Sequence, residues 1–168
     1  MTESAEATAL EPFIGTFHKT GTTLVAKILK GLERDGVLNT WWMHDDPEAP
    51  EQWDIAFHYH SRYLWEPDLI SDAHDRRYVL LVRDPRDVIV SSVKYHLDAT
   101  EEWLHKPNEE FGGQTYQQKL QSLSTDAERQ VFEVERMGGR ILGMMRAIRQ
   151  EDPRIKVVHL ERLMTDYD

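Results

Sequence analysis

The residues with the clearest chemical potential lie near the start of the chain, in the run His18-Lys19-Thr20-Gly21-Thr22-Thr23. A short apolar segment precedes this run, and the apolar residues after it recur at the three- and four-residue spacing of a helix. A helix that starts at such a loop directs backbone N–H groups and the positive end of its dipole toward an anion. The glycine allows close approach, the threonines carry hydroxyl donors and Lys19 adds charge. The run therefore predicts a phosphate-binding loop.

Two other interpretations of this loop stay open. The first is a helix start capped by threonines beside an exposed lysine. The second is the nucleoside-triphosphate loop of a kinase or NTPase, in which a glycine and four further residues precede Gly-Lys-Ser/Thr. Here Lys19 precedes Gly21, and Gly15 lies six positions before Gly21, so the order differs. Such an enzyme also needs an acidic Mg²⁺ ligand, for which Asp84 is the candidate.

A second polar segment, 83–91, follows the apolar run 78–82. Asp84 is suited to cap a helix, and Pro85 is suited to its first position. The guanidinium of Arg83 is a planar fork that matches a phosphate. Ser91 lies about two helical turns after Asp84 and so faces the same side. A surface ion pair between Arg83 and Asp87 is the alternative role for that arginine.

Together, the two segments resemble the PAPS-dependent sulfotransferases, where PAPS is 3'-phosphoadenosine 5'-phosphosulfate. The first is similar to that family's 5'-phosphosulfate loop, Pro-Lys-Ser/Thr-Gly-Thr-Thr, and the second to its 3'-phosphate segment. The resemblance implies a P-loop-like fold and PAPS as co-substrate, with no metal. It assigns the 3'-phosphate to Arg83 and Ser91, and the 5'-phosphosulfate to Lys19, Thr20, Gly21, Thr22 and Thr23.

The chain departs from the family pattern at three places. His18 stands where proline is usual, and Leu24 stands where tryptophan often follows the threonines. The sequence ends at Asp168, whereas typical members continue to a basic, glycine-containing loop that also binds the 3'-phosphate. We therefore expect either a compact sulfotransferase or a form shortened at the C-terminus.

The implied reaction transfers a sulfuryl group to a hydroxyl or amine acceptor, which is a small molecule or a carbohydrate. Lys19 is the expected catalytic cation for the charge that grows on the leaving phosphate. The acceptor must also lose a proton, and a histidine has a suitable pKa. His60 near the end of a predicted strand is the expected base, with His58 and Glu66 as alternatives. A two-histidine metal site at His58 and His60 is a further possibility.

Apolar periodicity predicts alternating strands and helices, hence an α/β fold with a mainly parallel central sheet flanked by helices. We expect the 78–82 strand at the centre of the sheet, because its apolar run suits a strand covered on both faces. Residues 98–113 read as a polar loop, and one long helix is expected from Thr125 to about Ile148, with Val131 and Val134 on its apolar stripe. The expected strands are 12–17, 41–43, 54–60, 78–82 and 155–160, and the other expected helices are 24–36, 66–74 and 85–96.

Length and composition place the chain among soluble globular proteins. Its 168 residues fit one domain, which we expect over 12–168 after a flexible N-terminus at 1–11. A formal net charge of -10 argues against nucleic acid or an anionic membrane as partner. No apolar run reaches membrane-spanning length, and there are no cysteines, so we expect a cytoplasmic protein. A non-catalytic nucleotide-binding module remains an alternative function, and the oligomeric state is open.

Overall fold

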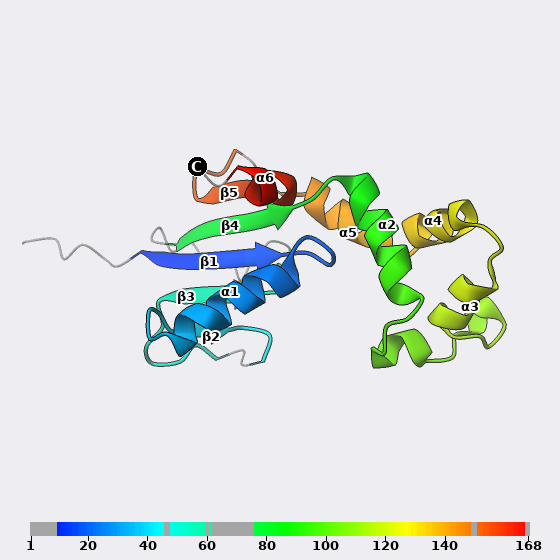
Figure 1. Cartoon of the computed structure of the whole chain (residues 1–168), viewed down its shortest axis with the longest axis horizontal. Helices are drawn as coiled ribbons and strands as arrows, with labels where there is room; N and C mark the ends of the chain where they lie inside the picture. Colours follow the sequence, from blue (N-terminus) through cyan, green and yellow to red (C-terminus); the bar gives the residue numbers. More distant parts are fainter. Residues whose placement is uncertain (1–9, 46–47, 60, 62–75, 149–150, 167–168) are drawn as a thin grey trace, which may run out of the picture. The chain divides into compact units, whose positions relative to one another are not determined.

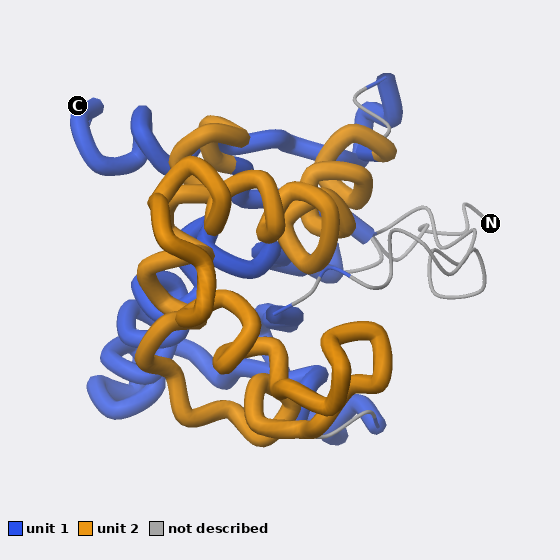
Figure 2. The backbone as a smooth tube through the Cα atoms, turned by 90° about the vertical axis from the view of Figure 1, so that its right-hand side faces the viewer, with its two compact units in different colours: residues 1–82, 148–168 blue, residues 83–147 orange. Residues whose placement is uncertain are grey.

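The structure is a computed structural model that describes residues 10–45, 48–59, 61, 76–148 and 151–166. The chain divides into two compact units, coloured separately in Figure 2. The first consists of the chain up to residue 82 together with the chain from residue 148, and the second consists of residues 83–147. The domain boundary expected at residue 12 stays a prediction. The helix predicted over 66–74 lies outside the described residues.

The first unit is built on a five-stranded parallel sheet with the strand order β2-β3-β1-β4-β5 (Figure 1). The predicted α/β fold with a parallel sheet is confirmed. The central position, however, belongs to β1 and not to the strand predicted over 78–82, because β1 is third in the order of five strands and β4 is fourth. The strands are β1 (Glu11–Thr16), β2 (Thr40–Trp42), β3 (Ile55–His58), β4 (Arg76–Val82) and β5 (Ile155–His159).

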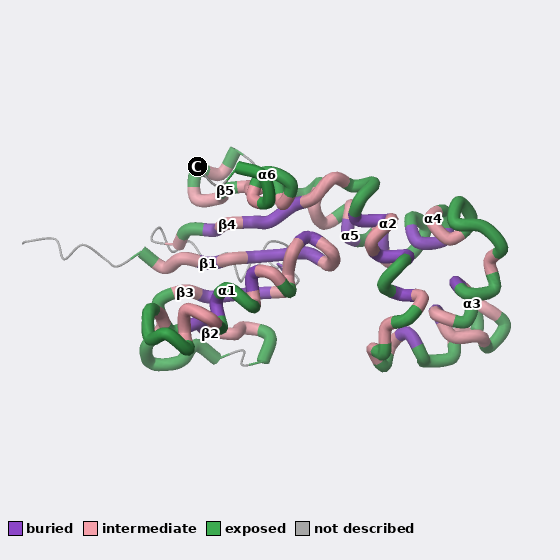
Figure 3. Tube along the Cα trace, viewed as in Figure 1, coloured by how far each residue is buried: buried purple, intermediate pink, exposed green. Residues whose placement is uncertain are grey.

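The helix α1 (Thr22–Arg34) packs on one face of this sheet. Its buried residues Val25 and Leu29 contact Phe57 of β3 and Leu81 of β4. Leu163 of the short helix α6 (Leu160–Thr165) packs against the same cluster. On the opposite face, Phe13, Tyr78 and Leu80 are also buried. Both faces of β4 are therefore covered, as its apolar sequence predicts, and the carboxyl halves of β1 and β4 are buried (Figure 3).

The second unit consists of helices. They are α2 (Pro85–His96), the 3-10 helices η2 (Glu102–His105) and η3 (Glu109–Phe111), α3 (Tyr116–Ser122), α4 (Asp126–Glu135) and α5 (Met137–Arg146). The prediction of a polar loop over 98–113 was wrong in part, because η2 and η3 lie within it. Leu104 of η2 is fully buried in a core with Tyr116, Leu120 and Phe132, so this segment has an apolar anchor.

The single long helix predicted from Thr125 was also wrong. The predicted capping box is present at Thr125 and Glu128, but the helix stops at Arg136, whose φ of -124° and ψ of -115° are not helical. A new helix starts at Met137, and a Cβ on Gly138 would lie 2.3 Å from Ile89 Cδ1 of α2. Close packing of α5 on α2 thus requires this glycine. The break turns the predicted stripe residues Val131 and Val134 outward, while Phe132 and Glu133 are buried.

Candidate functional site

The loop between β1 and α1 is closed by the side chain of Thr20. This side chain is fully buried, and its Oγ1 accepts a hydrogen bond of 2.8 Å from the backbone N–H of Phe17. The same hydroxyl donates to the carbonyl oxygen of Phe17 at 3.0 Å, and the Thr20 N–H donates to that oxygen at 3.1 Å. A hydroxyl has one proton to donate, and Thr20 donates it to the Phe17 carbonyl within the loop. A direct contact of Thr20 with a ligand stays a prediction, whereas its role in holding the loop is visible.

Two residues of this loop have left-handed backbone conformations. Lys19 has a φ of 64°, which costs a residue with a side chain about 1–2 kcal/mol. Gly21 has a φ of 103°, which only glycine adopts readily. A Cβ on Gly21 would also lie 3.0 Å from Leu160 Cδ1 and 3.5 Å from Leu81 Cδ2. Glycine is therefore required at position 21 both by the backbone and by packing, and Lys19 holds a strained conformation.

Gly21 is the N-cap of α1, and this helix start has the composition of an anion-binding end. Gly21 has no side chain with which to cap the helix, and the first turn contains no acidic residue. Without such a cap, the first backbone N–H groups of the helix lack an intrahelical partner and attract negative charge. Thr23 is exposed on this turn, and Thr22 is half-buried.

Thr22 is held in place by a network that the sequence analysis missed. Its Oγ1 lies 2.9 Å from Oγ1 of Thr16, the last residue of β1, and it donates to the Phe17 carbonyl at 3.2 Å. The Thr16 carbonyl in turn accepts a 2.9 Å bond from Ser61, which is fully buried. The Thr16 hydroxyl also lies 3.3 Å from the Tyr59 carbonyl oxygen. Thr16 thus ties the loop between β1 and α1 to the segment that follows β3.

Of the expected base His60 and its alternatives His58 and Glu66, the structure describes only His58. His60 and Glu66 lie outside the described residues, so their roles stay predictions. His58 is the last residue of β3 and is buried, with 8% of its surface exposed. Among the described residues, no group of three or more His, Asp or Glu side chains is arranged to hold a metal ion.

The second predicted segment follows β4, which ends at Val82, and it starts α2 as expected. Asp84 caps this helix by accepting a 2.8 Å hydrogen bond from the Arg86 N–H. Its carboxylate also pairs with the Arg86 guanidinium at 2.7 Å, and these bonds lower the pKa of Asp84 to about 2. The role as helix cap is therefore confirmed. A role as Mg²⁺ ligand would compete with the Arg86 guanidinium for the same oxygens.

Arg83 lies two residues before the start of α2, and Asp87 and Ser91 lie four residues apart within the helix. Arg83 Nη2 is 3.7 Å from the Asp87 carboxylate, which forms the ion pair that the sequence analysis considered as the alternative. More than half of the Asp87 side chain is exposed, so this ion pair contributes little to stability. Ser91 follows Asp87 by four residues and is half-buried. The binding roles of both residues stay predictions.

His96, at the end of α2, is fully buried and takes part in a polar cluster of the second unit. Its Nδ1 lies 3.0 Å from Oε2 of Glu133, which is also fully buried. The hydroxyl of Tyr116 donates to the same carboxylate oxygen at 2.9 Å. Burial, followed by the charge of Glu133, raises the pKa of Tyr116 well above its usual value. Glu133 occupies a core position that is normally apolar, so the sequence alone did not indicate it.

Comparison with known proteins supports the fold. No family model matches this chain, and no curated protein matches its sequence. Among solved structures, the crystal structure of mouse sulfotransferase SULT7A1 complexed with PAP is similar, with a TM-score of 0.59 and 16% sequence identity. The match covers 94% of this chain and 54% of the mouse chain, so this chain spans about half the length of that protein. No described helix is long and apolar enough to cross a bilayer. The chain thus has an α/β fold like that of the mouse sulfotransferase.

Proposed function

We propose that this chain is a sulfotransferase that moves a sulfuryl group from PAPS to a hydroxyl or amine acceptor. The observation that carries the proposal is the uncapped start of α1, placed directly after a lysine in a left-handed conformation and a glycine that packing requires. Backbone strain of this kind is concentrated at binding and catalytic sites. The likeness of the fold to a PAP-bound sulfotransferase supports the same function.

The residues present fit a 5'-phosphosulfate. Gly21 has no side chain to obstruct the helix start, and the first N–H groups of α1 supply hydrogen-bond donors for an anion. Lys19 supplies the positive charge, Thr22 and Thr23 complete the loop, and Thr20 keeps it closed. Arg83 and Ser91 are the proposed ligands of the 3'-phosphate, because an arginine fork and a hydroxyl both suit phosphate oxygens.

The proposed chemistry is a single in-line displacement. The acceptor oxygen or nitrogen forms a bond to sulfur while the bond from sulfur to the phosphate oxygen breaks. Lys19 stabilises the negative charge that grows on the leaving phosphate oxygen. His60 takes the proton that the acceptor loses, and His58 and Glu66 are the alternatives for this step. The scheme requires no metal ion.

Ligand preference separates this proposal from a kinase or NTPase. In isothermal titration calorimetry, we expect 3'-phosphoadenosine 5'-phosphate to bind and Mg-ATP to bind far more weakly. Lys19→Ala should weaken nucleotide binding, whereas Lys27→Ala, which removes an exposed lysine from the helix α1 that follows the loop, should leave it unchanged. Tight Mg-ATP binding without 3'-phosphoadenosine 5'-phosphate binding would reject the sulfotransferase proposal.

Turnover separates the proposal from a non-catalytic nucleotide-binding module. We expect labelled PAPS to transfer its sulfuryl group within a mixed panel of phenols, alcohols, sugars and amines. Lys19→Ala should lower kcat by about 10²–10³-fold, the usual loss when one donor to a developing anion is removed. If His60 is the base, His60→Ala should remove the acidic limb of the pH–rate profile, and an unaltered profile would exclude it.

A further inference from the structure

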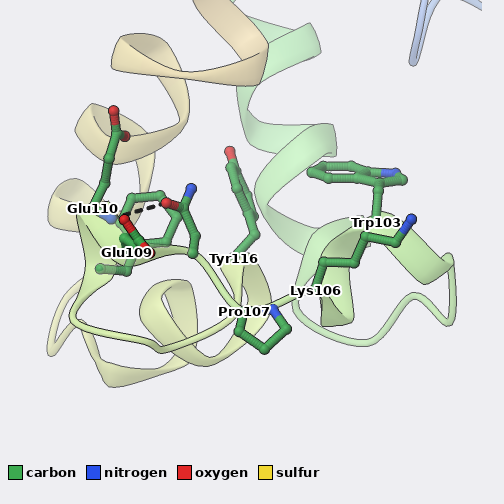
Figure 4. Close-up of a pocket in the computed structure, with 8 residues that line it drawn as sticks. Trp103, Lys106, Pro107, Glu109, Glu110 and Tyr116 are labelled. Atoms are coloured by element: carbon green, nitrogen blue, oxygen red, sulfur yellow. Dashed lines mark hydrogen bonds between the residues drawn. The ribbon is translucent and has the colours of Figure 1, made fainter.

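A pocket in the second unit is lined by aromatic rings and carboxylates. It has a volume of about 460 Å³, which is within the range of small-molecule sites. Trp103 of η2, Phe111 of η3 and Tyr116 of α3 provide the rings, and Glu109 and Glu110 lie at its edge (Figure 4). Figure 4 shows Tyr116 between Trp103 and the segment that carries the two glutamates. None of these residues belongs to the proposed nucleotide site.

The rings of the pocket are fixed in place before any ligand binds. Tyr116 packs edge-on against Trp103, with ring centres 5.1 Å apart, and against Phe111 at 6.3 Å. The buried carboxylate of Glu133 holds the Tyr116 hydroxyl at 2.9 Å, and His96 packs edge-on against Trp103 at 5.2 Å. The positions of the rings are therefore set by the core of the unit, and a ligand does not have to order them.

The segment that carries the glutamates is also closed by hydrogen bonds. Pro107 and Thr115 form an isolated antiparallel bridge, and the Asn108 N–H donates to the Gln114 carbonyl at 3.0 Å. The Asn108 side chain accepts a 2.9 Å bond from the Glu110 N–H, drawn as a dashed line in Figure 4. The backbone positions of Glu109 and Glu110 are therefore fixed relative to the rings.

The charges around the pocket leave it negative. Lys106 pairs with Glu102 at 3.1 Å, and Arg136 pairs with Glu110 at 3.4 Å, so these four charges cancel. Glu109 then leaves a net charge of -1 at the edge. In addition, the Arg136 guanidinium lies over the Phe111 ring, 5.5 Å from its centre. This contact occupies one face of Phe111 from outside the pocket.

We propose that this pocket binds the ammonium group of an organic amine. Aromatic faces attract cations through the ring quadrupole, and a nearby carboxylate adds a direct charge interaction. Glu109 repels an anionic ligand, and it offers a neutral ligand only a hydrogen-bond acceptor without the charge interaction. The volume leaves space for an apolar body next to the ammonium group. The inference is independent of the proposed sulfuryl transfer, because every residue that carries it lies in the second unit.

Three probes of similar shape test the charge preference: benzyltrimethylammonium, benzyl alcohol and benzoate. Binding is followed in the full chain, without nucleotide, through the indole N–H resonance of Trp103, which Trp103→Phe assigns. We expect a saturable shift with benzyltrimethylammonium at millimolar concentrations, and much weaker shifts with the other two. Equal binding of benzyl alcohol, or no saturable shift with the ammonium probe, would overturn the proposal.

Variants of the pocket edge provide a second test. Glu109→Gln should weaken binding of the ammonium probe about two- to fivefold, whereas Glu135→Gln, at an exposed glutamate outside this pocket, should not. Glu109→Lys should reverse the preference, so that benzoate binds more tightly than benzyltrimethylammonium. If Glu109→Lys leaves the order of the three probes unchanged, Glu109 does not determine the ligand. Both glutamates are exposed, so these variants should fold normally.

Discussion

Replacing Thr20 with valine tests how the phosphate loop is held. The two side chains have nearly the same shape, so Thr20→Val keeps the packing of this fully buried site and removes only the hydroxyl. That hydroxyl accepts from the Phe17 N–H at 2.8 Å and donates to the Phe17 carbonyl at 3.0 Å. The substitution therefore removes two hydrogen bonds from one turn without opening a cavity.

The expected loss of stability follows from the hydrogen bonds that the N–H and the carbonyl of Phe17 keep in the variant. The carbonyl oxygen still accepts from the Thr20 N–H at 3.1 Å and from the Thr22 hydroxyl at 3.2 Å, so it remains satisfied. The N–H loses the Thr20 oxygen in a buried position, which costs about 1–3 kcal/mol. We therefore expect Thr20→Val to lower the free energy of unfolding by about 2 kcal/mol.

Urea unfolding followed by circular dichroism measures this loss. Thr23→Val, at an exposed threonine three residues later, is the matched control and should change stability very little. Thr20→Ser keeps the hydroxyl and removes one methyl group, so it should cost about 1 kcal/mol or less. If Thr20→Val is as stable as the original chain, or if serine is no better than valine, the hydroxyl does not hold the loop.

Three further predictions concern the two helix starts. Because Lys19 has a φ of 64°, Lys19→Gly should be more stable than Lys19→Ala by about 1 kcal/mol in urea unfolding, while both variants lose nucleotide affinity; equal stability would mean that the backbone is not strained. Gly21→Ala should destabilise the chain by more than about 1 kcal/mol in the same assay, because φ is 103° and the new Cβ meets Leu160. The pKa of Asp84 is lowered to about 2, so its charge contributes stability that is present above its unfolded pKa and is lost as the pH falls through about 2. The melting temperature of Asp84→Asn should accordingly approach that of the original chain between about pH 5 and pH 2, and a constant difference would contradict this.

The sequence predicted the elements of the first unit better than their order. Strand and helix bounds were accurate to about one or two residues, because apolar periodicity is a local property. The position of β1 at the centre depends on its pairing with β3 and β4, which lie far along the chain. An apolar run such as 78–82 indicates that both faces of a strand are covered. Both faces are covered in β4, which lies beside the central strand, so the run does not identify the centre of the sheet.

The second unit shows where an apolar stripe misleads. A stripe through Val131 and Val134 fits an uninterrupted helix, but the helix ends at Arg136, whose backbone is not helical, and Gly138 of the next helix packs closely on Ile89. The buried face then carries Glu133, although a charged residue is normally expected on the surface. Its partners His96 and Tyr116 lie 37 and 17 residues away, so no local pattern could reveal the cluster.

The candidate site divides in the same way between local and distant features. Lys19, Gly21 and the threonines form a contiguous pattern, and the structure places them at a strand-to-helix turn as expected. Thr16 and Ser61, which support the loop from below, are 45 residues apart and carry no motif. The sequence did contain one indication of this role, because Thr16 is a polar residue at the end of an apolar strand, directly before the loop.

The predicted variants of the loop separate a binding function from a purely structural one. In a loop that serves only to connect β1 and α1, relieving strain at Lys19 would stabilise the chain at no other cost. In a phosphate-binding loop, the strain persists because the surrounding contacts keep the lysine in the conformation that the ligand needs. Thr20→Val should then lower both stability and nucleotide affinity, whereas Lys19→Gly should raise stability relative to Lys19→Ala without restoring affinity. If Thr20→Val is less stable than the original chain, Lys19→Gly is more stable than Lys19→Ala, and all three variants bind nucleotide weakly, Thr20 supports the loop and Lys19 binds the ligand.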